Sequence, residues 1–343
     1  MSGPFFTIIT ATRNAAIVLP RLLDCLAGQT CRDFELILQD GASTDVTTAV
    51  AEACRGRLPA LVVASEPDAG IYDAWNKALQ RAAGEWILFL GADDRLAAED
   101  TLARCKERLA GIGPEKVFAA GAVEMELPGG HAGQRVFPEI AGAAAALSRS
   151  IPAPHSALFH RRSLFHTHVF DTRFRISGDY EFLCRAWKND SQALQLDMLV
   201  TRMGWGGLSS RPQAAFLTRW EYAKAASRHF PRTWTLQRFK VLAGGLLIAG
   251  LCRLAGPSRA ARVLDRLRVV NRLRLRVGAD RDLLRLHRLG HFADQLDRQQ
   301  AVGQAGAFDT DEIRELEAAF KAPVGDAHVQ ETRPVLIDAV LFA

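Results

Sequence analysis

Residues 65–94 constrain the fold of this chain more than any other stretch, because a helix pattern there leads directly into a buried strand. Apolar side chains recur at helical spacing over 71–82, and residues 86–90 form a short apolar run that ends at a glycine. Asp93 and Asp94 follow this run. They are therefore expected at the carboxyl end of a strand, where open α/β sheets place their ligands.

The chemistry of Asp93 and Asp94 predicts a metal and phosphate site. Adjacent carboxylates without a neighbouring Cys or His suit Mg²⁺ or Mn²⁺ better than zinc, and such ions are usually shared with the phosphates of a substrate. A diphosphate substrate follows from this interpretation. In the alternative, the two residues cap the next helix, whose apolar pattern begins at about Ala97.

The N-terminal half alternates strand and helix patterns. Strands are expected at 5–11, 34–38 and 60–64, and helices at 17–26 and 46–54. This alternation predicts a parallel sheet with helices on both faces. The strands are followed by polar residues, namely Thr10, Thr12, Asn14, Asp40, Ser43, Asp45, Glu66 and Asp68. All of these are expected along one edge of the sheet.

Four segments, TIITATRN, LILQDGASTD, SEPDAGIYDAWNKAL and GEWILFLGADD, resemble the successive blocks of the family 2 glycosyltransferases. The resemblance covers roughly residues 5–210. Through residues 67–78 and the later SGDYEF and GGLSS segments, the chain is most similar to bacterial exopolysaccharide glycosyltransferases of the colanic acid type. The resemblance implies a GT-A fold, with a Rossmann-like, mostly parallel sheet, and an inverting transferase that uses a nucleotide-diphosphate sugar and a divalent metal.

The resemblance also implies roles for individual donor-side residues. Thr10, Thr12 and Asn14 match the segment that borders the nucleotide base, and Asp40 matches the acid that contacts the base. The other residues that match the donor site are Asp68, Tyr72, Asn76, Lys77 and Asp94. Lys77 could neutralise diphosphate charge, whereas Tyr72, like Trp75, has an alternative role in the core of its helix.

Asp93 matches the metal-binding acid of the DXD-like motif of the family. The chain departs from the commonest pattern at Gly91, where many members have an Asp or Asn that approaches the ribose. The resemblance therefore implies a metal ligand at Asp93 but leaves the ribose contacts open.

The acceptor side needs a base, because inversion by direct displacement requires a group that takes the proton of the attacking hydroxyl. Asp179, at the start of an expected helix, matches the family position of that base, with Glu181 in reserve. A helix N-cap is the alternative for Asp179. His155 follows two prolines and precedes a strand pattern. It is expected either to face the acceptor or diphosphate, or to be structural.

Composition predicts a cytosolic protein with more than one domain. The chain has 343 residues, is 48% hydrophobic, and has six cysteines without a close pairing pattern, which suits a reducing compartment. The first strand leaves no room for a signal peptide, and no apolar run reaches the length of a membrane span. The expected organisation is a GT-A domain at 1–215, a basic amphipathic helical region at 216–300, and a short helix and tail at 301–343.

The charge of the C-terminal region predicts a membrane partner. Residues 211–290 contain eighteen Lys and Arg against four acids, and residues 241–251 are almost wholly apolar. A basic helix with an apolar face is typical of binding to an anionic membrane surface. Nucleic acid is disfavoured as the partner by the nucleotide-sugar motifs. A helical domain that packs on the enzyme or on another subunit is the alternative.

The sequence thus predicts an inverting glycosyltransferase on the inner face of the cell membrane. Its donor is a nucleotide-diphosphate sugar, and its acceptor is a saccharide or a polyprenyl-diphosphate-linked molecule in bacterial exopolysaccharide or cell-surface glycan synthesis. A catalytically degenerate GT-A domain that serves as a binding or assembly subunit is the alternative, motivated by Gly91 and the basic appendage. A nucleotidyltransferase shares the metal chemistry, but the chain lacks a glycine-rich, basic phosphate loop near the first strand.

Overall fold

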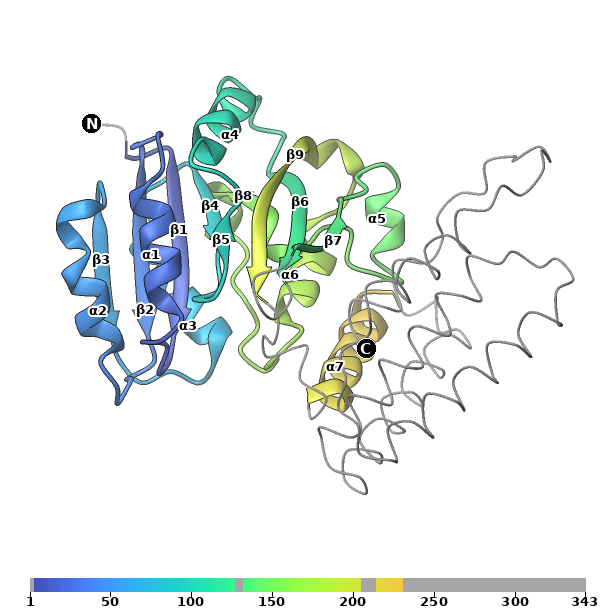
Figure 1. Ribbon diagram of the computed structural model, residues 1–343. Coiled ribbons are helices and arrows are strands. Elements are labelled where there is room, and N and C mark those ends of the chain that lie inside the picture. Colours follow the sequence, from blue (N-terminus) through green and yellow to red (C-terminus); the bar gives the residue numbers. More distant parts are fainter. Residues whose placement is uncertain (1–2, 127–131, 205–213, 231–343) are drawn as a thin grey trace, which may run out of the picture. The chain divides into compact units, whose positions relative to one another are not determined.

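The computed structural model describes residues 3–126, 132–204 and 214–230, all within one compact unit. A nine-stranded sheet has the order β3-β2-β1-β4-β8-β6-β9-β5, with β7 paired to β6 (Figure 1). The predicted basic helix and C-terminal tail beyond residue 230 lie outside the described residues. Among the described helices, none has the length and apolarity needed to cross a membrane.

The first half of the sheet is parallel, as predicted from the alternation of patterns. Its elements are β1 (Phe6–Thr12), α1 (Leu19–Ala27), β2 (Phe34–Asp40), α2 (Thr47–Ala53), the short 3-10 helix η1 (Arg55–Arg57), β3 (Leu61–Ser65), α3 (Ile71–Leu79) and β4 (Trp86–Phe89). In the register of these strands Thr12 pairs with Asp40, and Asp40 pairs with Ser65. The ends of β1, β2 and β3 are therefore level at one edge.

The second half adds antiparallel pairings. Its elements are β5 (Arg95–Leu96), α4 (Thr101–Leu109), β6 (Phe118–Glu126), β7 (Ala132–Val136), α5 (Ala143–Ala146), η2 (His155–Ala157), β8 (Leu158–Arg161), η3 (Arg162–His166), α6 (Gly178–Ala186), η4 (Asp190–Gln192), β9 (Ala193–Gly204) and α7 (Ala215–His229). Strand β8 is antiparallel to both β4 and β6, and β5 is antiparallel to β9. The sheet is therefore mixed as a whole.

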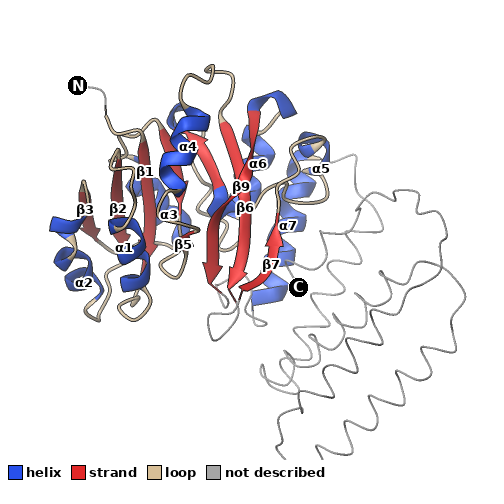
Figure 2. Cartoon of the chain, turned by 45° about the horizontal axis from the view of Figure 1, so that its top comes forward, coloured by secondary structure: helices blue, strands red, loops and turns tan. Residues whose placement is uncertain are grey.

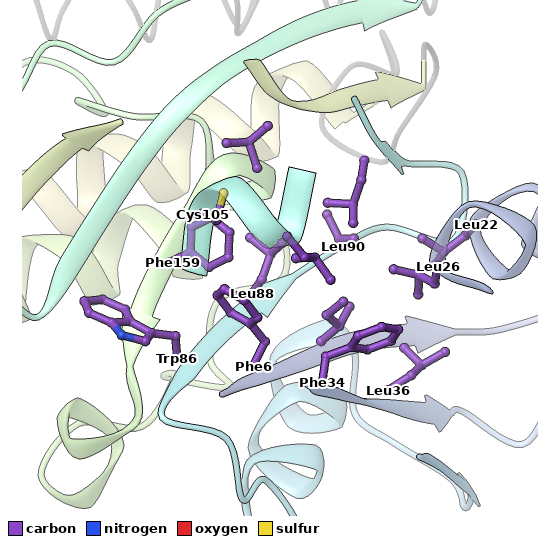
Figure 3. Packing of buried hydrophobic residues seen from close by; sticks show 14 of the residues in the cluster. Phe6, Leu22, Leu26, Phe34, Leu36, Trp86, Leu88, Leu90, Cys105 and Phe159 are labelled. Carbon is purple, nitrogen blue, oxygen red and sulfur yellow. The ribbon is translucent and has the colours of Figure 1, made fainter. Parts of the chain in front are cut away.

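Two apolar cores cover the two faces of the sheet. Strands β1, β2 and β4 are buried over almost their whole length, so they read as continuous apolar runs rather than alternating ones. One core lies with α1, α2 and α4, and the other with α3, α6 and α7 (Figure 2). Figure 3 shows the first core, in which Phe6, Phe34 and Trp86 from three neighbouring strands pack together.

Candidate active site

The turn after β4 carries Asp93 and Asp94, and it does not cap a helix. The Asp94 N–H donates to the Gly91 carbonyl at 3.1 Å, and β5 then pairs with β9. Helix α4 begins only at Thr101, with Asp100 at its N-cap. The alternative that Asp93 and Asp94 cap the next helix is therefore wrong, because β5 keeps the chain extended between the turn and α4.

The two carboxylates of this turn have different surroundings. Asp94 is buried, and its oxygens accept the N–H groups of Gly91 at 2.8 Å and Gly204 at 3.3 Å. Burial, and then the charge of Asp93, raise the pKa of Asp94 to about 7. Asp93 is half-buried, and within the described part of the chain its carboxylate accepts no hydrogen bond. Asp93 is thus available to a ligand, while Asp94 supports the turn.

Glycines on both sides give Asp93 its space. A Cβ on Gly204 would lie 2.7 Å from Asp93 Oδ2, and one on Gly91 would lie 2.9 Å from Asp93 Oδ1 and 3.1 Å from Asp94 Oδ2. A side chain at position 91 would therefore displace the carboxylates of Asp93 and Asp94.

The donor set of the turn fits a hard divalent ion. Asp93 and Asp94 offer only carboxylate oxygens, the ligand type preferred by Mg²⁺ and Mn²⁺. In residues 3–126, 132–204 and 214–230, no group of three or more His, Cys, Asp and Glu residues could hold a metal. An ion bound at Asp93 would need further ligands from water or from the phosphates of a substrate.

Asp40 ties together the ends of the first three strands. Its fully buried carboxylate accepts hydrogen bonds from Thr12 Oγ1 at 3.0 Å, from Ser65 Oγ at 2.7 Å, and from the N–H and hydroxyl of Ser43 at 2.8 and 2.5 Å. Burial acts to raise the pKa of Asp40, but these hydrogen bonds outweigh it and leave that pKa lowered. Asp40 therefore stays charged and orders the loops in which the donor-side residues lie.

The other residues predicted to border the nucleotide base lie in β1 and in the loop that follows it. Thr10 is buried in β1, and its hydroxyl has no hydrogen-bond partner among the residues described. Asn14 has a positive φ of 52°, and its side-chain oxygen accepts the Thr44 N–H at 2.8 Å. The Asn14 N–H in turn donates to Ser43 Oγ at 2.7 Å. The structure thus brings together the β1 and β2 loops, as the sequence predicted for one sheet edge.

The donor block before and within α3 is mostly held by protein contacts. Asp68 accepts the Gly70 N–H at 2.9 Å, and Lys77 donates to the Pro67 carbonyl at 2.7 Å. The side chain of Asn76 both donates to the Phe170 carbonyl and accepts the Phe170 N–H, each at 2.9 Å. These contacts favour a structural role for Asn76 in place of the predicted donor contact, because its amide is paired at both ends.

Asp179 lies in the first turn of α6, not at its cap. The N-cap residue is Ser177, so the capping alternative for Asp179 is wrong. Asp179 Oδ1 accepts the Tyr180 N–H at 2.8 Å and the Tyr72 hydroxyl at 3.3 Å. Burial raises the pKa of Asp179 to about 6. This carboxylate is therefore basic enough to accept a proton near neutral pH, and Tyr72 is a neighbour of the candidate base.

Glu181 and His155, the other acceptor-side candidates, have contacts that favour structural roles. Glu181 is 1% exposed, and its carboxylate pairs with Arg185 at 2.9 Å and His229 at 3.0 Å. The His155 ring stacks on the Trp75 ring with their centroids 5.0 Å apart. Burial lowers the pKa of His155 to about 3. Trp75 itself is a buried core residue.

Sequence reasoning missed Glu221 of α7. Its buried carboxylate accepts three consecutive backbone N–H groups, those of Arg175 at 2.8 Å and of Ile176 and Ser177 at 2.9 Å each. The position lies 44 residues after Ser177, inside a stretch noted for positive charge. A lone acid in a basic helix was the available signal.

The mixed α/β sheet with an acidic turn at a strand end is the arrangement that the resemblance to GT-A glycosyltransferases implies. The model of glycosyl transferase family 2 matches residues 7–164. A PGL/p-HBAD biosynthesis glycosyltransferase of Mycobacterium tuberculosis is 37% identical over 214 residues, which cover 61% of this chain and 81% of that protein. The chain belongs to glycosyltransferase family 2.

Solved structures agree on the fold. Staphylococcus aureus TarS 1–349 in complex with UDP-GlcNAc has a TM-score of 0.52 and 21% identity, covering 73% of each chain. Mannosyltransferase PcManGT from Pyrobaculum calidifontis, in complex with GDP-Man and Mn²⁺, has a TM-score of 0.51 and 20% identity, covering 80% of this chain and 81% of that one. The predicted GT-A fold and the prediction of a glycosyltransferase are confirmed.

Proposed function

We propose that this glycosyltransferase moves one sugar, with inversion, from a nucleotide-diphosphate sugar to a saccharide or polyprenyl-diphosphate-linked acceptor in cell-surface glycan synthesis. The observation that carries the proposal is the Asp93 carboxylate, unpaired within the described residues beside Asp94. Donor and metal are supported by the complexes of the two similar structures with UDP-GlcNAc or with GDP-Man and Mn²⁺. A lipid-linked acceptor would place the enzyme on the inner face of the membrane.

In the proposed mechanism Asp179 removes the proton from the acceptor hydroxyl as its oxygen attacks the anomeric carbon. A bond forms between that oxygen and the carbon while the bond to the diphosphate breaks, so the configuration inverts. A divalent ion held at Asp93 would stabilise the negative charge of the departing diphosphate. Asp40 and Asn14 order the loops where the nucleotide base of the donor would lie. Asp68 and Lys77 hold the loop before α3.

A donor screen tests this proposal directly. Purified protein with Mn²⁺ is mixed with individual nucleotide sugars, and the shift in melting temperature and then sugar hydrolysis are measured. Asp93→Ala should remove the metal-dependent shift and the turnover without unfolding, because Asp93 is half-buried in a turn rather than in the core.

Asp197→Ala, which removes an exposed carboxylate on β9, is the matched control and should behave as wild type. Metal-dependent donor binding that survives in Asp93→Ala would contradict the assignment. Donor binding by wild type without any turnover would favour the alternative of a binding or assembly subunit.

A further inference from the structure

The loop that precedes α6 is held by one side chain from a distant helix. Glu221 of α7 is 4% exposed, and it accepts the N–H groups of three successive residues, Arg175, Ile176 and Ser177. Ser177 also donates its hydroxyl to the Thr218 carbonyl of α7 at 3.1 Å. Because a buried carboxylate must be satisfied by hydrogen bonds, these contacts fix the loop against α7.

This loop determines how Tyr72 meets Asp179. The Tyr72 hydroxyl lies 2.5 Å from the Ile176 carbonyl and 3.3 Å from Asp179 Oδ1. Burial, and then the charge of Asp179, raise the pKa of Tyr72 well above its usual value, so the hydroxyl keeps its single proton. The hydroxyl donates mainly to the nearer Ile176 carbonyl, so its hydrogen bond to Asp179 Oδ1 is the weaker of the two.

We propose that Glu221 is a positioning residue for the base of this transferase, acting through the Ile176 carbonyl and Tyr72 on the orientation and proton affinity of Asp179. The inference rests on the proposed function, in which Asp179 is the base. Asp40 and Asp94, by contrast, take their hydrogen-bond partners from residues at the ends of β1, β2 and β9, and from Ser65 and Gly91. A change at Glu221 should therefore affect the chemical step and not donor binding.

The groups around Asp179 decide the direction of the effect. Tyr72 of α3 faces Asp179. Tyr180, the neighbour of Asp179, and Tyr222 of α7 line the same cavity of about 40 Å³ as Asp179. The charge of Glu221 acts to raise the pKa of Asp179. Loss of the Glu221 charge lowers the pKa of Asp179 directly. Release of the Ile176 carbonyl lets Tyr72 donate more strongly to Asp179, which lowers the pKa of Asp179 further.

The test compares wild type with Glu221→Gln and Glu221→Asp in the full-length protein. For Glu221→Gln, kcat at saturating donor should fall roughly ten- to a hundredfold with the donor KM unchanged, because the base is displaced. The acid limb of the kcat profile should also move to lower pH. Glu221→Asp keeps the charge, so the acid limb of its kcat profile should stay at the wild-type pH. Its kcat should fall less than that of Glu221→Gln.

A second measurement does not depend on transfer. Titration of the Asp179 carboxyl by ¹³C NMR, assigned with Asp179→Asn, should give a lower pKa in Glu221→Gln than in wild type. Glu52→Gln, which removes an exposed carboxylate of α2 paired with Arg55, is the charge-matched control and should leave kcat, its profile and the titration unchanged.

The outcomes separate this inference from the proposed function. A folded Glu221→Gln with wild-type kcat, profile and Asp179 titration would overturn the positioning role even if Asp179→Asn is inactive. If Glu221→Gln does not fold, a wild-type kcat in Glu221→Asp would overturn it. If wild type transfers no sugar, the proposed function fails, and the titration still decides whether Glu221 controls Asp179.

Discussion

At the scale of single residues, three aspartates show how surroundings assign different tasks to one side chain. Asp40 is held charged because hydrogen bonds from Ser43, Ser65 and Thr12 outweigh its burial. For Asp94 and Asp179 burial prevails, with Asp93 adding to it at Asp94, and their pKa values rise to about 7 and about 6. Of the three, Asp179 combines a raised pKa with a place in the lining of a cavity, as expected of a candidate base.

Asp179→Asn tests the base. Because the carboxylate must be deprotonated to act, kcat of wild type at saturating donor and metal should fall about tenfold per pH unit below about 6. The variant should transfer sugar about two to four orders of magnitude more slowly, with donor affinity nearly kept. Near-normal transfer in the variant would contradict the assignment, and lost donor binding would place Asp179 in the donor site instead.

His155→Phe tests whether His155 is structural. Burial holds the folded-state pKa at about 3, below the usual 6.5, so the folded state binds fewer protons. The contribution of neutral His155 to the free energy of unfolding is therefore fully present above about pH 6.5 and is lost as the pH falls toward 3. Melting temperatures measured from pH 8 to pH 4 should decline less in the variant, and transfer should persist. Abolished transfer in a folded variant would instead support the predicted role of His155 on the acceptor side.

At the scale of elements, the site depends on where strands end beside one another. Strand β9 ends at Gly204, whose N–H reaches Asp94 and whose bare Cα lies against Asp93. The turn after β4 is thereby held by a strand that follows it by about a hundred residues. On the other face, α6 packs on α7, and Tyr180 stacks on Tyr222 with ring centroids 3.6 Å apart.

Gly204→Ala should weaken metal use without removing a ligand. The added Cβ would lie 2.7 Å from Asp93 Oδ2 and 3.0 Å from the Asp93 carbonyl, so the carboxylate must shift. The Mn²⁺ concentration for half-maximal activity should rise by roughly tenfold or more, as for other groups that orient a metal ligand. A matched control is Gly56→Ala, where a Cβ would meet nothing within 4 Å. Equal metal dependence in the two variants would refute this account of the turn.

At the scale of the whole molecule, one unit combines the parallel donor half and the mixed second half. Tyr72 of α3 reaches Asp179 of α6, and α7 in turn holds the loop before α6. Helix α7 begins at Ala215, so a cut at the predicted domain boundary of residue 215 would remove Glu221. A truncation that probes the basic region should therefore begin after residue 230.

Removal of residues 231–343 should release the protein from anionic vesicles while transfer to a soluble acceptor persists. Binding of the full-length protein in vesicle sedimentation should weaken as salt rises, because the attraction of Lys and Arg to the lipid is screened. A full-length protein that ignores anionic vesicles at low salt would contradict the membrane prediction. Light scattering would then show whether truncation reduces an oligomer.

The sequence by itself determined the alternation of strands and helices, the shared edge of the first three strands, and the candidacy of Asp93 and Asp179. These features depend on local periodicity, on turn residues and on a family resemblance, all of which are readable along the chain. It could not show which of the two adjacent acids is paired, because Asp94 accepts the N–H of Gly204, far away in the sequence, in addition to that of nearby Gly91.

Only the tertiary structure decided the contacts of Asn76, Glu181 and Glu221. Each of these polar side chains has a partner from another element: the Phe170 backbone for Asn76, His229 in addition to Arg185 for Glu181, and the 175–177 loop for Glu221. A buried polar group must find such a partner, but the partner is chosen by packing and not by neighbours in the chain. For this reason the sequence indicated candidate residues for the chemistry, and the fold determined which contacts each of them makes.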